Sequence, residues 1–95
     1  MVDFYTGTAV AAELVPQEGG YKGWVFINWT EPGEKKFSAV KDVKRIEQKI
    51  KEQRLKGWLA SSEKDHTTMH TILTKMGAAC YGQDDHSLHF MKEVA

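Results

Sequence analysis

A chain of 95 residues is long enough for one small domain and too short for a second lobe that closes over a substrate. Its 13 lysine and arginine residues balance 13 acidic residues, which excludes long-range attraction of nucleic acid or an anionic membrane by net charge. The one cysteine, Cys80, has no partner for an intrachain disulfide and suits a reducing compartment. No apolar run reaches the roughly 18–20 residues of a membrane span, and no signal-peptide pattern opens the chain. We therefore expect a cytoplasmic domain.

The first third of the chain predicts two paired strands. Residues 8–15 are apolar and tolerate β-structure, and Pro16 ends this segment because it lacks a backbone N–H. The Gly19–Gly20 pair permits positive φ angles and predicts a turn. The following segment, residues 21–29, is apolar on both faces, which favours a central strand covered on two sides. We expect the two segments to form a hairpin, and residues 3–5 allow one further strand.

A long amphipathic helix is predicted over residues 35–54. Its apolar positions recur every three or four residues, as expected of a helix that lies on a sheet. From Glu34 to Lys56, nine basic residues outnumber four acidic ones, a local excess of +5 that the whole-chain balance hides. A charged run of this kind is usually a solvated face, although it could contact phosphates or an acidic protein. The apolar positions are Phe37, Val40, Val43, Ile46 and Ile50.

The second half of the chain predicts a strand, then a helix, and a glycine that ends the helix. Residues 55–60 are apolar enough for a short buried strand. Ser62 followed by Asp65 resembles a capping box, which predicts the start of a helix. Gly77 stands where a left-handed residue is wanted after the last helical turn.

The end of the chain predicts a turn and a last strand. Residues 81–86 are polar and indicate the turn, and residues 87–94 alternate as a strand. The resulting order is β-β-α-β-α-β. We therefore predict an α/β (α+β) domain in which two helices pack on a mixed sheet of four to five strands. A ferredoxin-like sandwich is the alternative that the same order allows.

From "GWVFINWTEPGEKKF" through "TKMGA" to "HFMKEV", the chain resembles the C-terminal two-thirds of the GNAT acyltransferase superfamily. The phrases "TKMGA" and "HFMKEV" look like that family's last helix end and the strand after it, and "GWVFINWTEPGEKKF" is similar to small phage-encoded GNAT-like proteins. The similarity covers residues 21–94 and implies one truncated GNAT-like domain over residues 1–95. Where the family has a glycine-rich, acyl-CoA-binding turn, this chain has only "EPGEKKF", a degenerate form of the motif.

The resemblance also implies roles for particular side chains. Tyr81 would act as a general acid that protonates the departing CoA thiolate. Glu31, just past the expected central strand, would act as a base for an amine acceptor. Gly33, Lys35 and Lys36 would hold the pyrophosphate of acetyl-CoA, the possible cofactor.

Other polar clusters give weaker indications of chemistry. His66 and His70 have the spacing of metal ligands on one helix face, but such pairs are more often surface residues, so no metal is predicted. Cys80 has no partner motif and suggests a buried thiol. No ordering of serine, histidine and aspartate that is typical of a hydrolase stands out in the sequence. A composite zinc site would combine the His66 and His70 pair with ligands near the C-terminus, namely His86, His89, Asp84 and Asp85.

Aromatic and basic residues indicate a protein-binding surface. An uncovered tryptophan on a thin domain marks such a surface, so we predict partner contacts by Trp29 and Trp58, together with Lys44 and Arg45 of the basic helix. The function predicted is a non-catalytic GNAT-like interaction module, of phage or mobile-element type, that binds a larger protein or itself. The alternative is a small acyl-CoA-dependent N-acyltransferase. A nucleic-acid contact protein is a third, unfavoured hypothesis, because interleaved aromatics and base-reading residues are missing.

Overall fold

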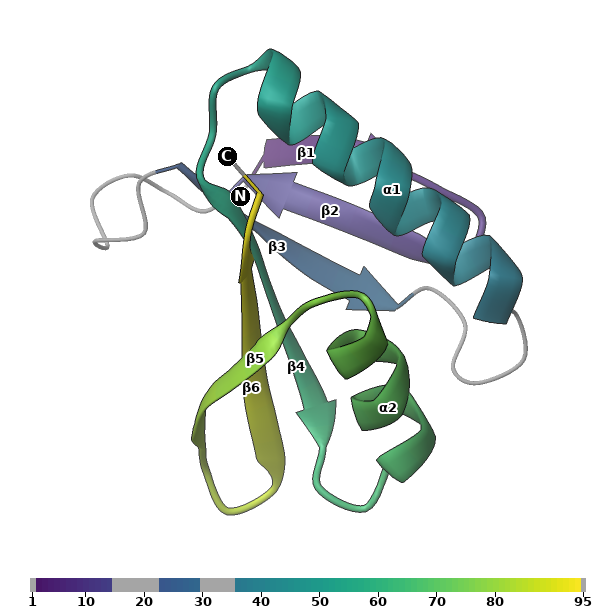
Figure 1. Cartoon of the computed structure of the whole chain (residues 1–95), viewed down its shortest axis with the longest axis vertical. Helices are drawn as coiled ribbons and strands as arrows, with labels where there is room; N and C mark the ends of the chain where they lie inside the picture. The colour runs from purple at the N-terminus through teal and green to yellow at the C-terminus, as the bar shows by residue number, and fades with distance from the viewer. Residues whose placement is uncertain (1, 15–22, 30–35, 95) are drawn as a thin grey trace.

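The computed structural model describes residues 2–14, 23–29 and 36–94, without the side chains of Val2, Lys36 and Phe37 (Figure 1). Neither helix of these ranges is long and apolar enough to cross a bilayer. The elements are, in chain order, β1 (Val2–Thr6), β2 (Val10–Leu14), β3 (Trp24–Trp29), α1 (Lys36–Glu52), β4 (Gly57–Glu63), α2 (Thr67–Lys75), β5 (Ala79–Gln83) and β6 (Ser87–Glu93).

Six strands form one sheet in the order β1-β2-β3-β4-β6-β5. Only β3 and β4 run parallel among the described pairs, and the other neighbours are antiparallel. The mixed α+β architecture with two helices is confirmed, with one strand more than the upper number expected. The additional strand β5 lies where the sequence predicted a turn, and the turn itself is shorter. The predicted hairpin is also confirmed, because Val10 pairs with Trp29 and Leu14 with Val25.

Both helices lie on one face of the sheet, where their side chains share a groove with Lys92 of β6 (Figure 1). In the apolar stripe of α1, Val40 is half-buried beside the groove, whereas Val43, Ile46 and Ile50 are buried in the core against the sheet, as their spacing predicted. Each such side chain contributes about 1.5–3 kcal/mol by leaving water. Phe37, at the start of that stripe, has a side chain outside the described part of the chain.

The opposite face of the sheet, here called the open face, has no helix over it in the described ranges. On β3 the residues that face the helices, Val25 and Ile27, are buried. Trp24 and Phe26 on the open face are half-buried, and Asn28 is exposed. The expectation that this strand is covered on two sides is therefore wrong for the described residues.

A buried carboxylate joins α1 to the turn between β1 and β2. Asp42 is only 4% exposed, and its Oδ2 accepts hydrogen bonds from the backbone N–H groups of Ala9 at 2.8 Å and Val10 at 3.1 Å. Gly7 lies so close that a Cβ there would stand 2.4 Å from Asp42 Cγ. Only glycine fits at this position, and the contact fixes the helix over the first hairpin.

The ends of α2 test two local predictions. Gly77 follows the helix with a φ of 93°, as the predicted stop requires. The capping box at Ser62 and Asp65 is wrong, because β4 continues through Ser62 to Glu63. The helix instead begins after His66, whose side chain makes no capping hydrogen bond. Pairing with β6 along its whole length keeps β4 extended past the polar residues that looked like a cap.

Candidate functional site

The parallel strands β3 and β4 separate at their C-terminal ends. They pair from Trp24 with Gly57 to Ile27 with Ala60 and no further, although each strand continues for two or three residues. Figure 1 shows the two strands diverging as a V, with α2 beside the wider end. In α/β sheets, ligands characteristically bind at the carboxyl ends of strands.

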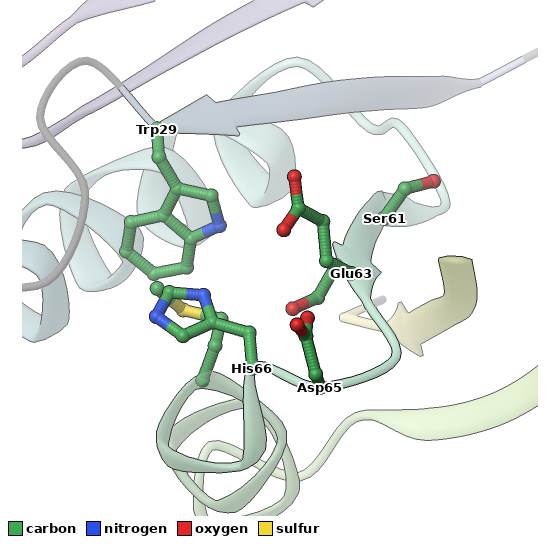
Figure 2. Close-up of a pocket in the computed structure, with 7 residues that line it drawn as sticks. Trp29, Ser61, Glu63, Asp65 and His66 are labelled. Carbon is green, nitrogen blue, oxygen red and sulfur yellow. The ribbon is translucent and has the colours of Figure 1, made fainter. Parts of the chain in front are cut away.

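A cavity of about 510 Å³ fills this divergence, and we call it the splay pocket. Its size lies within the range of small-ligand sites. Strand β3 supplies one aromatic wall, β4 supplies the opposite edge, and the start of α2 closes the end (Figure 2). The lining residues are Trp29, Ser61, Ser62, Glu63, Asp65, His66 and Met69.

Two polar atoms of the splay pocket have no hydrogen-bond partner. Both Trp29 Nε1 and Ser62 Oγ are buried and unpaired in the described structure, and Ser62 is only 7% exposed. Figure 2 shows the indole nitrogen turned toward the side of the cavity where Glu63 lies. Because buried polar groups are nearly always paired, these atoms are the ones that a bound ligand would satisfy.

The rim of the splay pocket is acidic. Glu63 and Asp65 are exposed carboxylates, and the described lining residues include no lysine or arginine. His66 lies below the Trp29 ring in Figure 2. His70, one turn further along α2, has its Nε2 2.8 Å from the Glu63 carbonyl oxygen, which ties the helix start to the end of β4. An ammonium group suits such a rim, whereas a phosphate would meet like charge.

The expected catalytic residues do not assemble in the described part of this pocket. Tyr81 lies on the edge strand β5, is 50% exposed, and places its ring 6.1 Å from that of His89. It does not line the splay pocket. The positions of Glu31, Gly33 and Lys35 lie outside the described residues, and so does the side chain of Lys36.

The predicted partner residues have different environments. Trp29 lines the splay pocket, and Lys44 and Arg45 are exposed on α1, where hydrogen bonding with Tyr5 raises the pKa of Arg45. Trp58 is 0% exposed, so the expectation of an uncovered Trp58 ring is wrong. Its position opposite Val25, under α1, buries it.

A second groove of about 430 Å³ separates α1 from α2. Its floor is apolar, with Val40, Val43, Ile72 and Met76, and three lysines stand around it, including Lys92, which pairs with Glu47 at 2.8 Å. Among the residues that the structure describes, no three histidine, cysteine or carboxylate side chains converge on a common metal position. His66 lines the splay pocket, and the His70 side chain contacts the Glu63 carbonyl oxygen.

An acetyltransferase of the GNAT family from Bacillus anthracis has a similar structure, with a TM-score of 0.65 and 13% sequence identity. The similarity covers 90% of this chain and 57% of that chain, so the present chain corresponds to little more than half of that protein. No protein-family model matches the sequence, and no curated protein does. The fold is therefore GNAT-like, as the resemblance over residues 21–94 implied.

Proposed function

We propose that this chain is a GNAT-fold interaction module, without acyl-CoA-dependent catalysis, that binds a basic segment of a protein partner in the splay pocket. One observation carries the proposal: the pocket combines an aromatic wall with an acidic rim. The stem of a lysine side chain would lie against Trp29 and Met69, and its ammonium group would meet Glu63 and Asp65. Support for a role without that catalysis is the position of Tyr81, which is outside the pocket lining.

The indole N–H signals of Trp29 and Trp58 provide an internal comparison for a binding experiment. Trp29 Nε1 is unpaired in the pocket, whereas Trp58 Nε1 donates to Glu47 Oε2 at 2.8 Å in the core. An oligolysine peptide is added to the protein and both signals are followed by NMR. We expect the Trp29 signal to move and the Trp58 signal to stay in place. The same peptide with acetylated lysines, which carries no charge, should bind more weakly.

Carboxylate substitutions test the rim directly. Glu63→Gln and Asp65→Asn should each weaken binding of the peptide by about 2- to 5-fold, the size expected for an exposed ion pair. Glu93→Gln is the matched control, because Glu93 is an exposed carboxylate at the far end of β6 and does not line the pocket. A Trp29 signal that no basic peptide moves, or affinities equal in all variants, would contradict the proposal.

A small acyl-CoA-dependent N-acyltransferase is the second candidate function. Two unpaired donors, Trp29 Nε1 and Ser62 Oγ, face a cleft between parallel strands and would suit the neutral amide and thioester groups of an acyl donor. In this alternative Tyr81 is the acid and Glu31 the base, while Gly33, Lys35 and Lys36 hold the pyrophosphate. Titration of acetyl-CoA should then move the Trp29 indole signal. No change at millimolar acetyl-CoA ends this candidate.

Mass analysis of the peptide in the same mixture separates binding from transfer. An interaction module leaves oligolysine unmodified in the presence of acetyl-CoA, whereas an acyltransferase adds acetyl groups, and Tyr81→Phe removes that activity. Self-association is the other form of the interaction proposal. Light scattering of the protein alone decides it, because a monomer at high concentration leaves a heterologous partner as the ligand.

A further inference from the structure

Three side chains on the open face form a linear hydrogen-bonded array. Ser61 Oγ lies 2.7 Å from His89 Nδ1, and His89 Nε2 lies 3.1 Å from Asp84 Oδ2. Ser61 of β4 is the direct cross-strand partner of His89 on β6, and Asp84 stands in the turn before that strand. A hydroxyl, an imidazole and a carboxylate in this order are the parts of a nucleophilic serine site.

Hydrogen bonds in the turn decide where the protons of the array lie. Asp84 Oδ1 accepts the backbone N–H groups of His86 and Ser87, both at 2.8 Å. These two bonds, and then the one to His89, lower the pKa of Asp84, so its carboxylate is ionised at neutral pH. An ionised carboxylate only accepts, hence His89 carries its hydrogen on Nε2. In the neutral imidazole, the Nδ1 lone pair is then directed at the Ser61 hydroxyl, which donates to it.

The array is held in place and is also accessible. The Tyr81 ring lies 6.1 Å from the His89 ring, which restricts the imidazole from one side. The His89 side chain remains 28% exposed, and Ser61 is half-buried, so a small molecule can approach from the open face. Although Ser61 also lines the splay pocket, Figure 2 shows its hydroxyl directed away from Trp29. The array therefore adjoins the splay pocket at Ser61, with its hydroxyl turned away from the aromatic wall.

We propose that Ser61 is an activated nucleophile that accepts acyl groups from small esters, with His89 as its general base and Asp84 as a positioning residue. The Ser61 oxygen forms a bond to the acyl carbon while its proton moves to His89 Nδ1. The bond from that carbon to the alcohol oxygen of the ester breaks, and the proton on Nδ1 passes to the departing alcohol. Water later hydrolyses the acyl-serine by the same route and restores the hydroxyl.

The expected reaction is slow acylation, because the sheet offers little stabilisation of a developing oxyanion. The ladder with β6 occupies the N–H groups on one edge of β4 through Ser61, and pairing with β3 ends at Ala60, so the described strands form no preorganised pair of oxyanion donors beside Ser61. Deacylation needs the same stabilisation and has a poorer leaving group than an activated ester, so with such an ester we expect the acyl form of Ser61 to accumulate.

The test uses p-nitrophenyl acetate and the intact chain, followed by tryptic mapping. Residues 57–64 form one tryptic peptide in which Ser61 and Ser62 are the only hydroxyl side chains, and fragmentation distinguishes them. We expect acetylation of Ser61 and not of Ser62, with the acetyl group removed by alkaline hydroxylamine as an oxygen ester is. An unmodified Ser61, or equal acetylation of both serines, overturns the proposal without any variant.

Variants with unchanged circular dichroism then assign the roles. His89→Gln should lower the rate of Ser61 acetylation by about 100-fold, the usual contribution of a general base. Asp84→Asn keeps the Oδ1 acceptor of the turn but presents an amide N–H to Nε2, which reverses the imidazole tautomer and should also slow acetylation. Ser38→Ala, on α1 across the sheet, should leave the rate unchanged. Acetylation rates equal to wild type in both His89→Gln and Asp84→Asn would overturn the roles assigned to these two residues.

Discussion

Trp58 of β4 donates its indole N–H to the carboxylate of Glu47 on α1 over 2.8 Å. The same oxygen of Glu47 is 2.8 Å from Lys92 Nζ on β6. One carboxylate therefore joins the long helix to two neighbouring strands, directly above a tryptophan that is fully buried. The packing of α1 on the sheet has a fixed polar contact at its centre.

Replacement of Trp58 by phenylalanine tests this contact. Trp58→Phe keeps an aromatic ring but removes the donor and part of the buried volume, while Glu47 retains Lys92. We expect the free energy of unfolding to fall by about 1–3 kcal/mol. Each kcal/mol should lower Tm by roughly 4–8 °C in a domain of this size. Trp24→Phe, at a half-buried position on the open face, is the control and should cost less. Equal losses in the two variants would contradict the assigned role.

Removal of the Asp42 carboxylate should destabilise the first hairpin. In Asp42→Ala, the backbone N–H groups of Ala9 and Val10 lose their acceptor in a buried place. We expect a loss of about 2–4 kcal/mol in urea unfolding, because each unsatisfied buried amide costs about 1–3 kcal/mol. Asp42→Asn retains one side-chain oxygen and should lose less. If alanine is tolerated as well as asparagine, the two amides do not depend on this side chain.

Local patterns were sufficient to predict most of the helices and strands. The stripe of α1 repeats with helical spacing, and Ile46 and Ile50 are buried as that spacing requires. The glycine at position 77 adopts the positive φ expected after a helix. Such features depend on neighbours within one or two turns, so a single sequence contains the needed information.

Features that depend on distant strands were missed or misplaced. Residues 81–83, the second part of β5, belong to the polar stretch that predicts a turn, yet pairing with β6 keeps them extended. Ser62 resembles a helix cap in the local sequence, because nothing near it in the chain indicates that it pairs with Leu88 of β6. The fit of Asp42 beside Gly7 depends on contact between residues far apart in the chain.

The candidate site was less predictable than the fold. Of the four residues predicted to contact a partner, only Trp29 lines the splay pocket. The divergence of β3 from β4 decides which side chains meet there, and it depends on strand pairing. Ser61 and His89 are 28 positions apart and come together only through cross-strand register. No spacing rule along the chain could have indicated that array.

Gly77 should be more sensitive to substitution than Gly82. Gly77 has a φ of 93°, and an added Cβ would lie 3.3 Å from Lys92 Cε. Gly77→Ala should therefore lower the free energy of unfolding by about 1 kcal/mol or more, from left-handed strain. Gly82→Ala is the matched control, because a Cβ there meets nothing within 4 Å. Thermal unfolding that ranks Gly82→Ala as the less stable variant would contradict this explanation.

Acid should weaken the β5–β6 turn through Asp84. Hydrogen bonds from the backbone of His86 and Ser87, followed by the contact with His89, lower the pKa of Asp84 in the folded chain. A carboxyl with a lowered folded pKa stabilises the fold above its ordinary pKa, and this stabilisation is lost as the pH falls through the folded value. The Tm of wild type minus that of Asp84→Asn should thus be constant near neutral pH and shrink below about pH 4. A difference that stays constant to the lowest pH at which both chains fold, or that grows in acid, would show that ionised Asp84 does not support the turn.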